Sequence, residues 1–98
     1  MLIQNKVKKW AYDKGIVSND NAHAQMQKMQ EEVNELFEAV EALDPDAVLN
    51  ELGDVLVTCI VQAACWELDI EHALEVAYNK ISKRTGTTVN GVFVKDGS

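Results

Sequence analysis

The sequence predicts an all-α fold in which a protomer of four helices associates into a larger helical bundle. Apolar residues recur at helical spacing through most of the chain, and capping residues separate the apolar stretches. Only one Pro and five Gly occur among 98 residues, which disfavours a turn-rich β-sandwich. With 47% hydrophobic and 26% charged residues, the composition is that of a globular protein, and we expect one domain spanning residues 1–98.

Two helices are expected in the first half of the chain. The first runs from about Leu2 to Lys14, and Gly15 can end it in a left-handed conformation. Its apolar positions are Ile3, Val7, Trp10 and Ala11. After a loop of capping residues, the second helix runs from about Asn21 to Leu43. Its apolar stripe consists of Met26, Met29, Val33, Leu36, Phe37 and Val40.

The third helix is expected from about Pro45 to Glu67, with Asp44 as its N-cap. Its second half is apolar nearly all round, so it must be covered on every side. We therefore expect a homo-oligomer that buries this helix in the subunit interface. One face of the same helix nevertheless carries a polar stripe, whose buried members need partners. The stripe consists of Glu51, Asp54, Thr58 and Gln62.

The last helix and the C-terminal segment follow a second cap. Asp69 is the predicted N-cap of a fourth helix from about Ile70 to Lys83, which is expected to be followed by a tail from Thr85 to Ser98. Asn90-Gly91 in this tail is typical of a two-residue hairpin turn. We expect either a short hairpin or an extended tail that lies on a neighbouring subunit.

Several features favour a cytoplasmic protein without membrane association. The longest apolar run, residues 55–66, is too short to span a bilayer, and the N-terminus lacks a signal-peptide pattern. Cys59 and Cys65 are six residues apart on one helix and cannot bridge each other. They are expected to be reduced, buried thiols.

Acidic and basic residues are segregated along the chain. The formal net charge is −7, and no Lys or Arg occurs between Lys28 and Lys80, a window that holds thirteen acidic residues. The negative balance disfavours binding to polymeric nucleic acid. The segregation can place an acidic zone, which attracts cations, beside a basic zone, which attracts phosphates. A solvated acidic surface is the alternative.

Two acidic pairs lie on the second and third helices. Glu32 and Glu35 are three residues apart, as are Glu51 and Asp54, so the members of each pair project together. A short turn predicts that the helices pack antiparallel, with Glu35 level with Asp54 and with Glu32 and Glu51 one turn away. Carboxylates that meet in one groove repel one another, and a divalent cation relieves this repulsion. All-oxygen ligation favours Mg²⁺, Mn²⁺ or Ca²⁺ over zinc.

Other kinds of active site find less support. A di-iron bundle needs Glu-x-x-His on two helices, and the nearest matches place Asp at predicted caps before His23 and His72. Both histidines are therefore expected at the surface or in caps. The chain has no Ser/His/Asp or Cys/His set competent for nucleophilic catalysis, and no phosphate-binding glycine loop.

The acidic pairs belong to a longer pattern. Two segments separated by fifteen residues resemble the EExxE…ExxD signature of the all-α nucleoside triphosphate pyrophosphatases: Glu31-Glu32-Val33-Asn34-Glu35 and Glu51-Leu52-Gly53-Asp54. The most similar branch is the small MazG-like nucleotide pyrophosphohydrolases. Three further segments resemble that branch: Trp10-Ala11-x-x-Lys14-Gly15, Gln25-x-x-Lys28 and Asn79-Lys80-Ile81-Ser82-Lys83-Arg84. The resemblance spans nearly the whole chain.

This resemblance implies a Mg²⁺-dependent hydrolase, with Mn²⁺ as a substitute, that converts a nucleoside triphosphate to the monophosphate and pyrophosphate. It also implies a homodimer or a dimer-based homotetramer. By motif position, the metal ligands would be Glu32, Glu35, Glu51 and Asp54. Glu31 or Glu35 would accept the proton of the attacking water. The residues expected to contact substrate are Trp10, Gln25, Lys28, Lys80, Lys83 and Arg84.

Alternatives remain for the roles of single residues and for the whole protein. The bases at positions 80–84 also suit the C-terminal dipole of a helix, Lys28 can pair with Glu32, and Trp10 can belong to the core. Related activities are those of phosphoribosyl-ATP pyrophosphohydrolase and of the dimeric dUTPases. An alternative of another class is a non-catalytic acidic helical module that binds a protein partner.

Overall fold

The structure, a computed structural model, describes residues 2–97 and is mostly helical, which confirms the all-α fold predicted for the protomer. Its elements are α1 (Ile3–Asp13), the short 3₁₀ helix η1 (Asn19–Asn21), α2 (Ala22–Glu41), α3 (Pro45–Cys65), α4 (Ile70–Ile81), β1 (Gly86–Val89) and β2 (Val92–Lys95). The two strands form one antiparallel hairpin.

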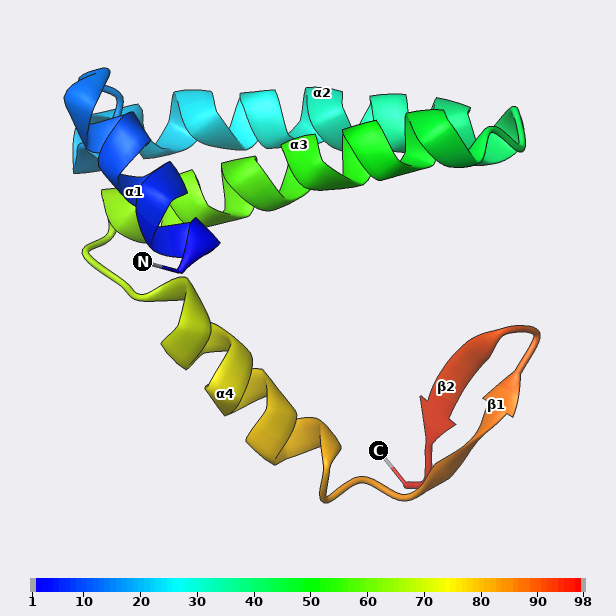
Figure 1. The fold of residues 1–98 in the computed structure, drawn as a ribbon. Coiled ribbons are helices and arrows are strands. Elements are labelled where there is room, and N and C mark those ends of the chain that lie inside the picture. The colour runs from blue at the N-terminus through cyan, green and yellow to red at the C-terminus, as the bar shows by residue number, and fades with distance from the viewer. Residues whose placement is uncertain (1, 98) are drawn as a thin grey trace.

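Helices α2 and α3 form a long antiparallel pair that dominates the fold (Figure 1). The connection is tight because Leu43 adopts a positive φ of 55°. The Asp44 side chain then accepts hydrogen bonds from the backbone N–H groups of Asp46 and Ala47, both at 3.2 Å. Pro45 occupies the first turn, where its missing N–H costs nothing. The predicted cap and the predicted antiparallel pairing are both confirmed.

The small buried core lies where α1 crosses the C-terminal part of α3 (Figure 1). Ala11 of α1 and Ala22 of α2 pack here with Val61 and Cys65 of α3. Gly15, at φ 74°, ends α1 as predicted and turns the chain back towards this core. This packing holds the N-terminal end of α2 against the C-terminal part of α3.

Helix α4 and the hairpin project away from the α2–α3 pair (Figure 1). The Asp69 side chain caps α4 by accepting a hydrogen bond from the N–H of Glu71 at 2.9 Å. Within residues 2–97, α4 packs against no secondary-structure element except α3, and the two strands pack only against each other. Asn90 and Gly91 both adopt positive φ in the hairpin turn. The tail is therefore a hairpin, the first of the two forms expected.

Much of the apolar surface of α3 and α4 is uncovered in the single chain. The side chains of Leu49, Leu56 and Leu74 are between 56% and 75% exposed. They border a cavity of about 1170 Å³ between α1, α3 and α4. The expectation that α3 needs covering on every side thus has a structural basis, because the chain itself does not provide the cover.

Helix α3 also changes two expectations. With 21 residues it is long and apolar enough to cross a membrane by length and composition, a test that the core helix of a soluble protein also passes. The apolar run considered from the sequence, residues 55–66, is shorter than the helix itself, which begins ten residues earlier, at Pro45. Both cysteines are free, but only Cys65 is buried, since Cys59 borders the open cavity.

Candidate metal centre

Helices α2 and α3 bring three glutamates to one point. Glu32 and Glu35 come from successive turns of α2, and Glu51 comes from the facing turn of α3. Each contributes a carboxylate oxygen, and these oxygens all lie within 4.8 Å of one another. We call these residues the glutamate cluster. The prediction that two neighbouring helices direct carboxylates to a shared point is confirmed for these residues.

Glu32 is the buried member of the glutamate cluster, with only 7% of its surface exposed. Its Oε1 forms an ion pair with Lys28, one turn earlier on α2, and lies 3.1 Å from the Lys28 Nζ. Its Oε2 is buried and has no hydrogen-bond partner in the described structure, and the same holds for the Oε2 of Glu51. Leaving a buried carboxylate oxygen unpaired is costly, so both atoms point to a missing cation or donor.

Electrostatics within the cluster act most strongly on Glu35. A hydrogen bond shared with Glu51 raises the pKa of the Glu35 carboxyl above its ordinary value of 4.5, and repulsion from Glu32 and Glu51 adds to this effect. A bound cation would reverse this shift by stabilising the ionised form. The hydrogen bond to Glu32 in turn raises the pKa of the Lys28 ammonium group, which stays charged.

The expected register of the four carboxylates is wrong. Glu35 and Glu51 both lie eight residues from Leu43, the residue at which the chain reverses, so these two side chains are level. Asp54 lies one turn further along α3, is exposed, and lines the cavity between α1, α3 and α4. It is therefore not part of the glutamate cluster in the single chain, and its role as a fourth ligand stays a prediction.

The C-terminal half of the polar stripe on α3, Thr58 and Gln62, forms hydrogen bonds within the chain. The buried Thr58 hydroxyl donates to the Val55 carbonyl at 2.6 Å. Gln62 donates to the Ala22 carbonyl at 3.0 Å and accepts from the Trp66 indole at 2.8 Å. The Gln62–Ala22 bond connects α3 to the start of α2, whereas the other two lie within α3 and its C-cap. This part of the stripe therefore serves packing.

Only some of the predicted substrate contacts lie at the cluster. Lys28 pairs with Glu32, and Gln25 lies one turn before it on α2. Trp10 is 48% exposed and is therefore not a core residue; it belongs to α1, which packs on α3 and not on α2. The bases Lys80, Lys83 and Arg84 are exposed at the far end of α4, which has no packing contact with α2.

Two further residues lie at the edge of the cluster. Glu31 is exposed, and one of its oxygens is 3.7 Å from the Lys28 Nζ. The amide nitrogen of Asn50 donates to Glu51 Oε1 at 3.5 Å, a contact that sequence reasoning missed. The only signal for Asn50 was its position directly before the ExxD pair.

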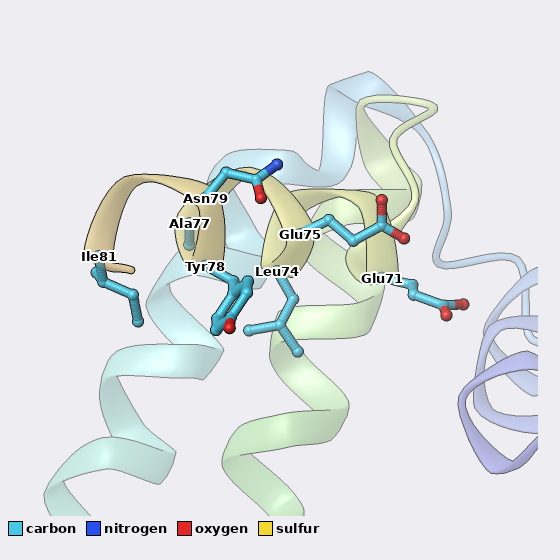
Figure 2. A pocket seen from close by; sticks show the side chains of 7 residues that line it. All are labelled: Glu71, Leu74, Glu75, Ala77, Tyr78, Asn79 and Ile81. Atoms are coloured by element: carbon cyan, nitrogen blue, oxygen red, sulfur yellow. The ribbon is translucent and has the colours of Figure 1, made fainter. Parts of the chain in front are cut away.

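The surroundings of the two histidines agree with the expected surface roles. His23 is exposed on the first turn of α2. His72 Nδ1 lies 4.0 Å from Glu75 Oε2 on the exposed face of α4. Figure 2 shows the shallow cavity beside this face, of about 570 Å³, whose lining side chains all come from α4. With a single helix as its wall, it offers no converging groups for catalysis.

Comparison with known sequences gives one match. The family described as MazG nucleotide pyrophosphohydrolase domain matches residues 20–89, which include α2, α3 and α4 and therefore the whole glutamate cluster. No curated protein and no solved structure matches the chain significantly.

Proposed function

Because this chain belongs to the MazG nucleotide pyrophosphohydrolase domain family, we propose that it hydrolyses a nucleoside triphosphate or deoxynucleoside triphosphate to the monophosphate and pyrophosphate. The observation that supports this proposal most directly is the glutamate cluster, with its two buried and unpaired carboxylate oxygens. Phosphoryl transfer depends mainly on positioning and on charge neutralisation, and a cation held by these carboxylates would supply both.

The residues of the cluster fit a hard divalent cation. All candidate donors are carboxylate oxygens, which Mg²⁺ and Mn²⁺ prefer. We propose that Glu32, Glu35 and Glu51 hold Mg²⁺, with Mn²⁺ as a substitute, and that Asp54 is the fourth ligand. When bound, such a cation neutralises phosphate charge and lowers the pKa of a coordinated water.

The remaining roles belong to side chains around the cluster. Lys28 fixes the carboxylate of Glu32 through their ion pair, so the ligand geometry is set before substrate binds. Glu35 is the proposed acceptor of the proton from the attacking water. Glu31, exposed beside Lys28, is the second candidate for that role. Gln25 and Trp10 are proposed to contact the nucleotide.

The same proposal covers the assembly and location of the protein. The uncovered apolar surface of α3 and α4 supports a homodimer or a dimer-based homotetramer. The free thiols and the net charge of −7 are consistent with a cytoplasmic enzyme that acts on free nucleotides and not on polymeric nucleic acid.

A nucleotide panel tests the proposed activity. The protein is incubated with Mg²⁺ and each common nucleoside and deoxynucleoside triphosphate, with dUTP and phosphoribosyl-ATP included, and the released phosphates are identified. We expect pyrophosphate and a monophosphate. Release of orthophosphate would contradict the assigned bond cleavage. No turnover, together with no Mg²⁺ binding by calorimetry, would favour the non-catalytic module.

A further inference from the structure

Helices α2 and α3 contact each other along a regular seam. The residues of α2 that are buried or half-buried recur at alternating intervals of three and four positions, which is the spacing of a coiled-coil interface. Glu32, the buried member of the glutamate cluster, lies within this row. The row consists of Ala22, Gln25, Met29, Glu32, Leu36 and Ala39.

A matching row on α3 completes the seam. Its spacing is the same, and it includes Glu51 of the glutamate cluster together with Thr58 and Gln62 of the polar stripe. The seam of this helix pair therefore contains two candidate cation ligands, and Glu35 lies at its edge, directly before Leu36. The row on α3 consists of Val48, Glu51, Val55, Thr58, Gln62 and Cys65.

The turn at Leu43 joins the two helices at one end of the seam, and Gln62 joins them near the other. Its Nε2 donates to the Ala22 carbonyl at 3.0 Å, while its Oε1 accepts from the Trp66 indole at 2.8 Å. Outside the glutamate cluster, the bond to Ala22 is the only side-chain hydrogen bond between α2 and α3 within residues 2–97. Because both ends of the amide are engaged, the orientation of the Gln62 side chain is fixed.

The position of the glutamate cluster explains why a second connection matters. Without a cation its carboxylates repel one another, and this repulsion acts to separate α2 from α3. Ala22 and Ala39, at the two ends of the α2 row, are small side chains that bury little apolar area against this force. The cluster lies between the turn and the Gln62 bond, so these two connections hold the helices together on either side of it.

We propose that Gln62 is a positioning residue of the cation site, which holds α2 in the alignment that directs Glu32 and Glu35 at Glu51. A polar contact in a helical seam specifies the alignment, because a displaced amide leaves its partners unpaired. Gln62 lies outside the cluster and acts through α2. The inference rests on the proposed function in one respect, since it takes the glutamate cluster as a cation site.

The substitution Q62M tests this role. Methionine keeps the flexibility and approximate length of the side chain but removes both hydrogen bonds. We expect the Mn²⁺ dissociation constant, measured by calorimetry without nucleotide, to rise about tenfold, the lower end of the effect of removing a group that orients a metal ligand. An unchanged constant in a variant that keeps its helical spectrum would overturn the proposal.

A second variant covers the case in which Q62M does not fold. Q62N keeps the amide but is one methylene shorter, so it cannot span both the Ala22 carbonyl and the Trp66 indole. Mn²⁺ binding is expected to weaken here as well. Wild-type affinity in a folded Q62N would count against the proposal as directly as wild-type affinity in Q62M.

D69A is the matched control for a loss of stability alone. It removes the side chain that caps α4 by accepting from the Glu71 N–H at 2.9 Å, and it leaves the α2–α3 seam intact. Both Q62M and D69A should lower the urea midpoint, but only Q62M should weaken Mn²⁺ binding. Equal weakening in both variants would show that Gln62 acts through general stability and would contradict the positioning role.

Hydrogen exchange separates this proposal from the proposed function. In EDTA, the backbone amides of residues 26–31 should exchange faster in Q62M than in the wild type, whereas those of α4 should not change; D69A should show the opposite pattern. This result is expected even if the protein hydrolyses no nucleotide. Equal protection of residues 26–31 in Q62M and the wild type would refute the connection through Gln62, while failure of the nucleotide panel alone would refute the enzymatic assignment.

Discussion

At the scale of single residues, the main feature is the electrostatic repulsion among the carboxylates of the glutamate cluster. Glu32 is buried with one free oxygen, and Glu35 and Glu51 lie close enough to share a proton. Such an arrangement is unfavourable for folding alone, and is more readily explained by selection for binding.

The substitution E32Q tests the buried member of the cluster. It keeps the shape of the side chain but removes the charge, so we expect pyrophosphate release to fall roughly a hundredfold or more. E38Q is the matched control, because Glu38 is an exposed glutamate on the same helix and outside the cluster. Equal activity of E32Q and E38Q would exclude Glu32 as a ligand.

The raised pKa of Glu35 predicts how the stability of the folded protein changes with pH. Because its folded-state pKa is raised, the folded protein binds more protons than the unfolded chain just above pH 4.5, and stability falls as pH rises through the folded pKa. In EDTA, E35Q should therefore become progressively more stable than the wild type as pH rises from 4.5 to 7. Urea midpoints at several pH values measure this difference, and a difference independent of pH would contradict the assigned cause.

At the scale of the elements, the helices follow local rules closely. Asp44, Asp69 and Gly15 all lie at the ends where their side-chain or backbone chemistry predicts them. The N-cap of α3 matters most, since it also fixes the turn that aligns Glu35 with Glu51.

The substitution D44A tests this cap. It removes the acceptor for the N–H groups of Asp46 and Ala47, and we expect a loss of about 0.5–2 kcal/mol of unfolding free energy. D46A is the control, because Asp46 lies in the same first turn but acts only through the helix dipole. Urea denaturation of both variants provides the comparison, and a loss for D46A as large as that for D44A would contradict the capping role.

At the scale of the whole molecule, the first prediction concerns stabilisation by a bound cation. A cation that binds only the folded protein adds stability, about 2.7 kcal/mol at a hundredfold excess over its dissociation constant. We expect Mg²⁺ or Mn²⁺ to raise the melting temperature of the wild type and to have little effect on the E32Q/E35Q variant. An equal rise in both proteins would show that the cation binds elsewhere.

The second prediction at this scale concerns the exposed apolar surface of α3 and α4. L74E places a charge in the cavity between α1, α3 and α4, so it should dissociate the oligomer in sedimentation experiments. L43E is the control, since Leu43 is 86% exposed at the α2–α3 turn and does not line that cavity. A monomeric wild type, or an L74E oligomer as stable as the wild type, would contradict the proposed interface.

The sequence by itself determined the helices, their caps and the acidic pairs, because helix periodicity and capping depend on residues within a few positions of each other. It also predicted the hairpin as one of two forms of the tail. Only the tertiary structure decided which carboxylates meet. The length of the turn at Leu43 fixed the register, aligned Glu51 with Glu35, and left Asp54 beside a different cavity.

The structure also decided where the basic residues lie relative to the acidic ones. Their segregation along the chain suggested adjacent zones, but α4 extends away from α2 and keeps the zones apart within one chain. Sequence patterns could not reveal this, because the direction of α4 depends on packing between distant elements, and most of the apolar surface of α4 is exposed in the single chain.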